Sequence, residues 1–129
     1  MAIAIFNDPT LPRSKAPHSN AVRTGNLLFV SGFPGYDGDV QIAKGDFPVQ
    51  MRLAMTNMLR AVAYAGSSIE RVVKVNVYLD ERSDFDRMND IYQEFFGRDP
   101  ARWPARTTIG AQLPRRDFLV EIDCIAEVD

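Results

Sequence analysis

The sequence predicts an α+β fold, a two-layer sandwich in which a mixed β-sheet carries two helices on one face. Three observations lead to it. Several short segments alternate apolar with other residues, which is the period of a β-strand. Two longer segments place apolar residues three and four positions apart, which is the period of a helix. The order is strands, helix, strand, helix, strands, and such an order favours helices packed against one face of a sheet.

Length and composition limit the protein to one domain. Because domains of about 100 to 150 residues are the commonest, we expect the 129 residues to form a single unit, residues 1–129. Hydrophobic residues at 46% and charged residues at 25% are typical of a globular protein. The net charge of −2 argues against a broad nucleic-acid surface. No apolar run approaches the roughly 20 residues of a membrane span, so we expect a cytoplasmic protein without membrane contact.

The N-terminal third predicts three strands separated by loops. Residues 2–6 are a short apolar run, and residues 10–17, with two prolines, predict a surface loop. Residues 21–32 predict a hairpin that turns at 24–26, with a largely buried second strand. Residues 33–38 are rich in glycine and proline, which indicates a loop.

The first helix is predicted between Asp46 and Gly66. Asp46 can cap it, Pro48 suits its first turn and Gly66 can end it. We expect its apolar face to pack in the core, and a methionine-rich groove for a partner is the alternative. That face consists of Met51, Met55, Met58, Leu59 and Val62.

A strand and a second helix follow. In residues 72–79 the alternation places Val73, Val75, Val77 and Leu79 on one side. The helix would be capped by Ser83, with Asp86 three residues later, and ended by Gly97. Its apolar stripe is Phe85, Met88, Tyr92, Phe95 and Phe96.

Two helices leave one face of the predicted sheet uncovered. That face would carry Val72, Tyr78, Leu119 and Ile125 among polar neighbours, which is much apolar surface to leave in water. We therefore expect this face to be buried in a homo-oligomer.

Residues 104–126 predict two strands with charged side chains at their centres, Arg106 on the first and Glu121 on the second. The planar guanidinium of arginine binds a carboxylate through two parallel hydrogen bonds. A carboxylate that is partly shielded from water can accept and return a proton. We interpret Arg106 and Glu121 as the two poles of a site for a small substrate that carries a carboxylate. An internal salt bridge between them is the alternative.

The remaining residues that could carry chemistry give weaker indications of a site. Cys124 falls on the strand face opposite Glu121, which favours a buried structural thiol over a nucleophile. His18 is the only histidine, so no histidine cluster for zinc exists and we expect no metal site. The glycines do not have the spacing of a dinucleotide or phosphate-binding loop.

Five segments, which together span most of the chain, resemble one known family. They are GNLLFVSG (25–32), AGSSIERVVKVNVYL (65–79), FDRMNDIYQEFFG (85–97), PART (104–107) and LPRRDFLVEIDCIA (113–126). In this order they resemble the RidA (YjgF) family of enamine and imine deaminases. The resemblance implies a chorismate-mutase-like α+β fold, a homotrimer with three clefts between subunits, and no metal or organic cofactor.

The resemblance also implies roles for single residues. Arg106 would bind the substrate carboxylate, and Glu121 would position or activate water. Ser31 and Gly32 would line the cleft, and Asn89 would lie near it. The implied reaction is hydrolysis of 2-imino or 2-enamino acids to 2-keto acids and ammonia. A non-catalytic trimer that binds or senses a carboxylate metabolite is the alternative.

Three positions depart from the usual family pattern. His18 follows Pro17 where typical members have tyrosine, Phe33 stands where they have glutamine, and Thr108 stands where they often have cysteine. By the resemblance these positions surround the ligand. We therefore expect a different or narrower substrate, such as a larger apolar or a dicarboxylic imine.

Overall fold

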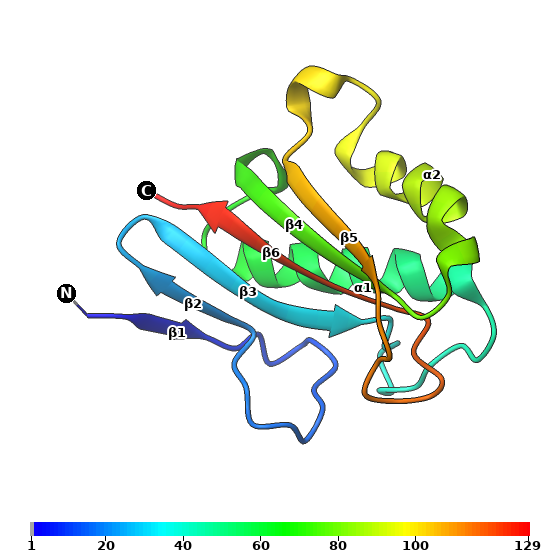
Figure 1. The fold of residues 1–129 in the computed structure, drawn as a ribbon. Helices are drawn as coiled ribbons and strands as arrows, with labels where there is room; N and C mark the ends of the chain where they lie inside the picture. The colour runs from blue at the N-terminus through cyan, green and yellow to red at the C-terminus, as the bar shows by residue number, and fades with distance from the viewer. Residues whose placement is uncertain (1) are drawn as a thin grey trace.

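The computed structural model describes residues 2–129, which form one six-stranded sheet with two helices on one face (Figure 1). The predicted α+β sandwich is confirmed. Within residues 2–129, neither helix is both long and apolar enough to cross a bilayer. The helices are α1 (Phe47–Tyr64) and α2 (Phe85–Phe96), and single 3₁₀ turns occupy Ile69–Arg71, Arg82–Asp84 and Pro100–Arg102. The strands are β1 (Ala4–Phe6), β2 (Ala21–Thr24), β3 (Leu27–Pro34), β4 (Val72–Leu79), β5 (Ala105–Gly110) and β6 (Val120–Glu127).

The order of the strands in the sheet is β1-β2-β3-β6-β4-β5. β4 and β5 are parallel, and every other neighbouring pair is antiparallel, so the sheet is mixed as predicted. The last strand, β6, lies between β3 and β4, in the centre of the sheet (Figure 1). β5 and β6 follow one another in the sequence but are separated by β4, which leaves β5 as an edge strand.

Helix α1 begins and packs as its sequence predicts. The side chain of Asp46 accepts a hydrogen bond from the Val49 amide at 3.2 Å, which satisfies one of the free donors of the first turn. Met51, Met55 and Met58 are fully buried in the core between α1 and the sheet. Core packing is therefore confirmed for the methionine face, and the groove for a partner is not formed.

The predicted alternation in β4 is wrong at its start. The pairing of β4 with β6 shifts register between Val72 and Lys74. This irregularity turns Val72 into the core, where it is 6% exposed, and leaves Val73 46% exposed. From Val75 onward the alternation is as predicted, because one bulge changes the phase of the side chains only locally.

Two further boundaries differ from the prediction. Phe33 and Pro34 belong to β3 rather than to a loop, because they pair with Ile122 and Glu121 of β6. Helix α2 is preceded by Asp84 instead of being capped by Ser83, since a 3₁₀ turn occupies Arg82–Asp84.

The uncovered face of the sheet carries a row of apolar side chains. Tyr78 and Ile125 lie on this face as predicted. Leu119 packs against the core instead, and Val72 belongs to the core. The strand register adds residues that the sequence did not indicate. Ile5, Val22, Phe29 and Ile125 are successive partners across β1, β2, β3 and β6.

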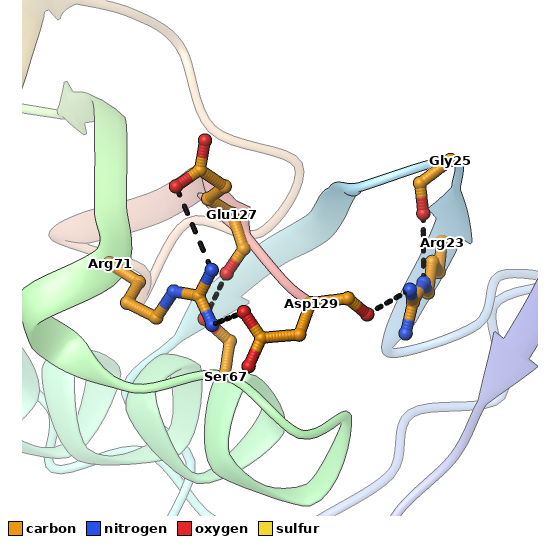
Figure 2. Close-up of polar contacts among 6 residues, drawn as sticks. All are labelled: Arg23, Gly25, Ser67, Arg71, Glu127 and Asp129. Atoms are coloured by element: carbon orange, nitrogen blue, oxygen red, sulfur yellow. Dashed lines mark hydrogen bonds and ion pairs between the residues drawn. The ribbon is translucent and has the colours of Figure 1, made fainter.

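Polar contacts hold the end of β6 to three other segments (Figure 2). The guanidinium of Arg71 lies 2.9 Å from the Asp129 carboxylate and 3.7 Å from that of Glu127. The hydroxyl of Ser67 donates to the Glu127 carbonyl at 2.7 Å, and Arg23 donates to the Asp129 carbonyl. These contacts connect Glu127 and Asp129, at and beyond the end of β6, to β2 and to the segment that precedes β4.

Candidate active site

Arg106 and Glu121 lie on opposite faces of the sheet. Arg106 of β5 is paired with Val75 of β4, whose side chain is fully buried toward the helices. Glu121 of β6 is paired with Tyr78, which lies on the uncovered face. Within residues 2–129 no hydrogen bond or ion pair joins Arg106 to Glu121, so the internal salt bridge is not formed.

Arg106 lies in a cavity of about 300 Å³ at the edge of the sheet, which we term the arginine pocket. Its walls come from α2, from the segment before β5 and from β5 itself. They are Asn89, Tyr92, Gln93, Trp103, Pro104 and Arg106.

The guanidinium of Arg106 is held by four residues of α2, one of which is Met88, whose sulfur accepts a hydrogen bond from Nη1 at 3.9 Å. Its Nη2 donates a hydrogen bond to Oδ1 of Asn89 at 2.7 Å, and its Cζ lies 4.8 Å from the ring centroid of Tyr92. The ring of Phe85 is farther away, at 6.0 Å. Stacking on an aromatic face and hydrogen bonds to Asn89 and Met88 fix the plane of the guanidinium while leaving other N–H groups for a ligand.

Glu121 lies in a second cavity, of about 480 Å³, which we term the glutamate pocket. The loop between β1 and β2, the end of β3 and the segment before β6 enclose it. Its polar or charged lining residues are Arg13, Ser14, His18, Asn20, Ser31, Arg115 and Glu121. The remaining lining residues are Pro12, Ala16, Gly32, Phe33, Pro34, Tyr36, Pro114 and Phe118.

Gly32 lies directly against the end of the Glu121 side chain. A Cβ at Gly32 would lie 2.5 Å from Oε2 of Glu121, so any other residue there would displace this carboxylate. Burial raises the pKa of Glu121, the charge of Asp123 raises this pKa further, and His18 acts in the opposite direction. A carboxyl group with a raised pKa can hold a proton closer to neutral pH than an exposed glutamate can.

Asp123, two residues along the same face of β6, is fixed by two residues of β4. The side-chain amide of Asn76 donates to its Oδ1 at 2.7 Å, and the hydroxyl of Tyr78 donates to its Oδ2 at 2.8 Å. Burial and the hydrogen bond to Asp123 raise the pKa of Tyr78 to about 12, so its phenol remains a donor at neutral pH. The carboxylate of Asp123 is thereby held on the same face as Glu121.

The structure divides the residues predicted for the site into two groups. His18, Ser31, Gly32 and Phe33 line the glutamate pocket with Glu121. Asn89 lies in the arginine pocket and contacts Arg106 directly. The two groups are on different faces of the sheet, and one chain does not bring them together.

The three positions that depart from the family pattern differ in how they lie relative to the pockets, and Thr108 lines neither of them. Phe33 borders the glutamate pocket, but its side chain is 6% exposed and belongs to the core. Thr108 shares the helix-facing side of β5 with Arg106, and its buried hydroxyl has no hydrogen-bond partner among residues 2–129. His18 is exposed at the pocket, with Nε2 3.5 Å from the Ser14 hydroxyl. As predicted, Cys124 is buried on the face opposite Glu121.

The sequence did not single out Tyr36 and Phe118 of the glutamate pocket, or Tyr92 as the support of Arg106. The apolar stripe predicted for the second helix includes Tyr92 but gives it no contact with Arg106. The signal that could have found it is its spacing, because Asn89 and Tyr92, three residues apart, lie on one face of a helix. In residues 2–129, no group of three or more His, Cys, Asp or Glu side chains is arranged to hold a metal ion.

Comparison with known proteins gives one consistent family. The family model described as Endoribonuclease L-PSP matches residues 9–128. A RutC family protein of Pyrococcus horikoshii is 37% identical over 127 residues, covering 98% of each chain. A protein of Dermatophagoides farinae named 2-iminobutanoate/2-iminopropanoate deaminase is 34% identical over 127 residues, covering 97% of this chain and 96% of that protein.

The solved structures give the same result for the fold. TdcF of E. coli, determined with bound serine, superposes with a TM-score of 0.87 at 28% sequence identity. The match covers 98% of this chain and 99% of TdcF.

Proposed function

Because the chain belongs to the RidA (YjgF) family, to which the Endoribonuclease L-PSP model corresponds, we propose that it is a hydrolytic deaminase of 2-imino and 2-enamino acids. The observation that carries the proposal is the separation of Arg106 and Glu121 into two pockets on opposite faces of the sheet. Two such half-sites become one site when the arginine pocket of one chain faces the glutamate pocket of another. The proposed assembly is a homotrimer with its sites between subunits.

The uncovered sheet face supports an assembly of this kind. Ile5 is 60% exposed and Phe29 is 43% exposed, and both belong to the apolar row across β1, β2, β3 and β6. A contiguous apolar surface of this kind is characteristic of a protein interface. In the proposed trimer the other subunits cover this row.

The proposed reaction assigns one task to each pocket. Arg106 binds the substrate carboxylate and so fixes the position of the imine carbon. Glu121 takes a proton from a water molecule as the oxygen of that water bonds to the imine carbon. That proton passes to the imine nitrogen, which gives a carbinolamine. The remaining proton of the added hydroxyl then passes to the same nitrogen as the carbon–oxygen double bond forms and the carbon–nitrogen bond breaks, so that ammonia and the 2-keto acid leave. Water is the only co-substrate and no electrons are exchanged, so the proposal includes no cofactor.

The experiment that tests this function uses imines generated in solution from amino acids by an amino-acid oxidase. The purified protein is expected to accelerate formation of the 2-keto acid and ammonia above the spontaneous rate. Sedimentation equilibrium at micromolar concentration is expected to give three times the 14.5 kDa of one chain. A monomeric mass would contradict the proposed trimer. No acceleration with any imine would contradict the proposed deaminase function.

A second candidate function is a non-catalytic trimer that binds or senses a carboxylate metabolite. The observation that favours it is the amino acid bound to TdcF, since serine carries a carboxylate and no imine. Tight binding of 2-keto acids together with the absence of turnover would select this function over deamination.

Asp123 is expected to tune the proton affinity of Glu121. Around Glu121 lie Asp123 on β6, Tyr78 on β4, and His18, Arg13 and Arg115 at the pocket lining. Asp123→Asn removes a negative charge that raises the pKa of Glu121, so this pKa should fall. Glu121 must be deprotonated to act as a base, and the acidic limb of the kcat/KM profile should therefore move to lower pH.

The matched control is Asp39→Asn, which makes the same change of charge at an exposed position outside both pockets. Its pH profile is expected to coincide with that of the wild type. An acidic limb that stays in place or moves to higher pH in Asp123→Asn would contradict this role of Asp123.

A further inference from the structure

The glutamate pocket has an apolar side that the proposed chemistry at Glu121 does not use. Its volume of about 480 Å³ falls within the range of small-molecule sites and exceeds what a carboxylate, an imine and a water require. Six residues form this apolar side, and three are prolines, whose rings have few conformations to lose when a ligand binds. They are Pro12, Ala16, Pro34, Tyr36, Pro114 and Phe118.

The two aromatic residues of this wall are packed against each other. The ring centroids of Tyr36 and Phe118 are 5.6 Å apart at an angle of 81°, an edge-to-face arrangement. Tyr36 is 8% exposed and Phe118 is 4% exposed. The two rings are therefore held in place by their own packing.

Helix α1 holds both aromatic residues through two buried polar side chains, Gln50 and Asn57. The amide of Gln50 donates to the Asp117 carbonyl at 2.9 Å and accepts from the Leu119 amide at 2.9 Å, which fixes the backbone on both sides of Phe118. The amide of Asn57 donates to the Tyr36 carbonyl at 2.9 Å. Buried amides on an otherwise apolar helix face are costly unless fully hydrogen-bonded, and here their bonds fix the wall.

The cations at this pocket are poorly placed to bind a second carboxylate. The side chain of Arg115 is 55% exposed, stacks 5.4 Å from the Phe118 ring centroid and lies 3.5 Å from the Asp117 carboxylate. Arg13 is exposed, and its guanidinium donates to the His18 carbonyl at 3.4 Å. Charges that are solvated and already paired contribute little to binding an exposed anion.

From this geometry we propose that the apolar wall receives the substrate side chain and selects 2-imino acids with large branched or aromatic side chains. Small and dicarboxylic 2-imino acids are the disfavoured classes. The inference rests on the proposed function, because it takes Arg106 and Glu121 as the groups that hold the carboxylate and the imine carbon. It goes beyond that function by naming the part of the site that decides the substrate.

The test compares imines generated in solution from phenylalanine, leucine, alanine and aspartate by the matching oxidases. The expected kcat/KM values for the phenylalanine and leucine imines exceed those for alanine and aspartate by about tenfold or more, which is the scale of discrimination by an apolar pocket. Equal or higher values for alanine or aspartate, with turnover intact, would overturn the inference and leave the deaminase function standing.

A binding measurement keeps the inference testable if no imine is turned over. The dissociation constants of phenylpyruvate, pyruvate and oxaloacetate are measured by calorimetry on the wild-type protein. Phenylpyruvate is expected to bind about tenfold or more tightly than the other two. Tighter binding of oxaloacetate would overturn the inference, whether or not the protein is an enzyme.

Ala16→Asp places a carboxylate at an exposed position of the wall without disturbing the core. It is expected to lower kcat/KM for the phenylalanine imine by about tenfold and for the alanine imine by less than about threefold. The control Ala63→Asp makes the same change at an exposed position of α1 outside the pocket, and should alter neither value. An equal loss for both imines in Ala16→Asp would count against a side-chain site.

Discussion

Arg106→Ala is expected to lower kcat/KM for every imine by about a hundredfold or more, because it removes a hydrogen-bonded charge that holds the substrate carboxylate. The loss should appear for small and large imines alike, since all of them carry this carboxylate. Binding of 2-keto acids, measured by calorimetry, should weaken in parallel. Arg106 borders a cavity and is half-buried, so its truncation is not expected to prevent folding.

Two further variants test whether the loss comes from the guanidinium of Arg106 itself. Arg106→Lys keeps the charge but loses the planar fork and the stacking on Tyr92, and is expected to recover only part of the activity. Arg52→Ala removes an arginine that pairs with Glu94 at 2.8 Å on the helix surface, outside both pockets, and should leave kcat/KM unchanged. Full activity in Arg106→Ala would exclude Arg106 as the carboxylate anchor.

Glu121→Gln is expected to lower kcat by about a hundredfold to ten-thousandfold, the usual contribution of a positioned acid or base. The amide has nearly the shape of the carboxyl group but cannot take a proton from water. Affinity for 2-keto acids should change little, because the carboxylate anchor is intact. Normal turnover by Glu121→Gln would show that another group handles the water.

Stability measurements distinguish the expected loss of activity in Glu121→Gln from a loss caused by unfolding. Burial raises the pKa of Glu121, so the folded protein binds a proton there more tightly than the unfolded chain does. The folding free energy that depends on Glu121 therefore becomes less favourable as the pH rises through the unfolded and then the folded pKa. At neutral pH the Glu121→Gln variant should have a Tm no lower than the wild type. Glu81→Gln, at an exposed position, is the control and should keep full activity.

Most of the fold could be predicted because local signals and packing agree. Asp46, the methionine face of α1 and the alternation from Val75 to Leu79 each indicate one structure, and that structure is present. The errors fall where the backbone departs from a regular period. A bulge after Val72 reverses the faces expected for Val72 and Val73. A 3₁₀ turn occupies the position where Ser83 was expected to cap α2.

The arrangement of the candidate site was less predictable. Alternation shows which residues of a strand share a face, but not whether that face is the one covered by helices. The insertion of β6 between β3 and β4 is a long-range pairing that leaves no local signal, and it places Glu121 beside Tyr78. Gln50 and Asn57 were overlooked for a similar reason, since they stand on a helix face that reads as apolar.

The central claim is that each site takes Arg106 from one chain and Glu121 from its neighbour. Mixing the two inactive variants tests it, by refolding Arg106→Ala and Glu121→Gln together in equal amounts. In a ring with identical head-to-tail interfaces, random mixing gives about one quarter of the sites both functional residues. We therefore expect the mixture to recover about a quarter of wild-type kcat/KM, whereas each variant alone stays inactive. A mixture as inactive as its components would contradict a site shared between subunits.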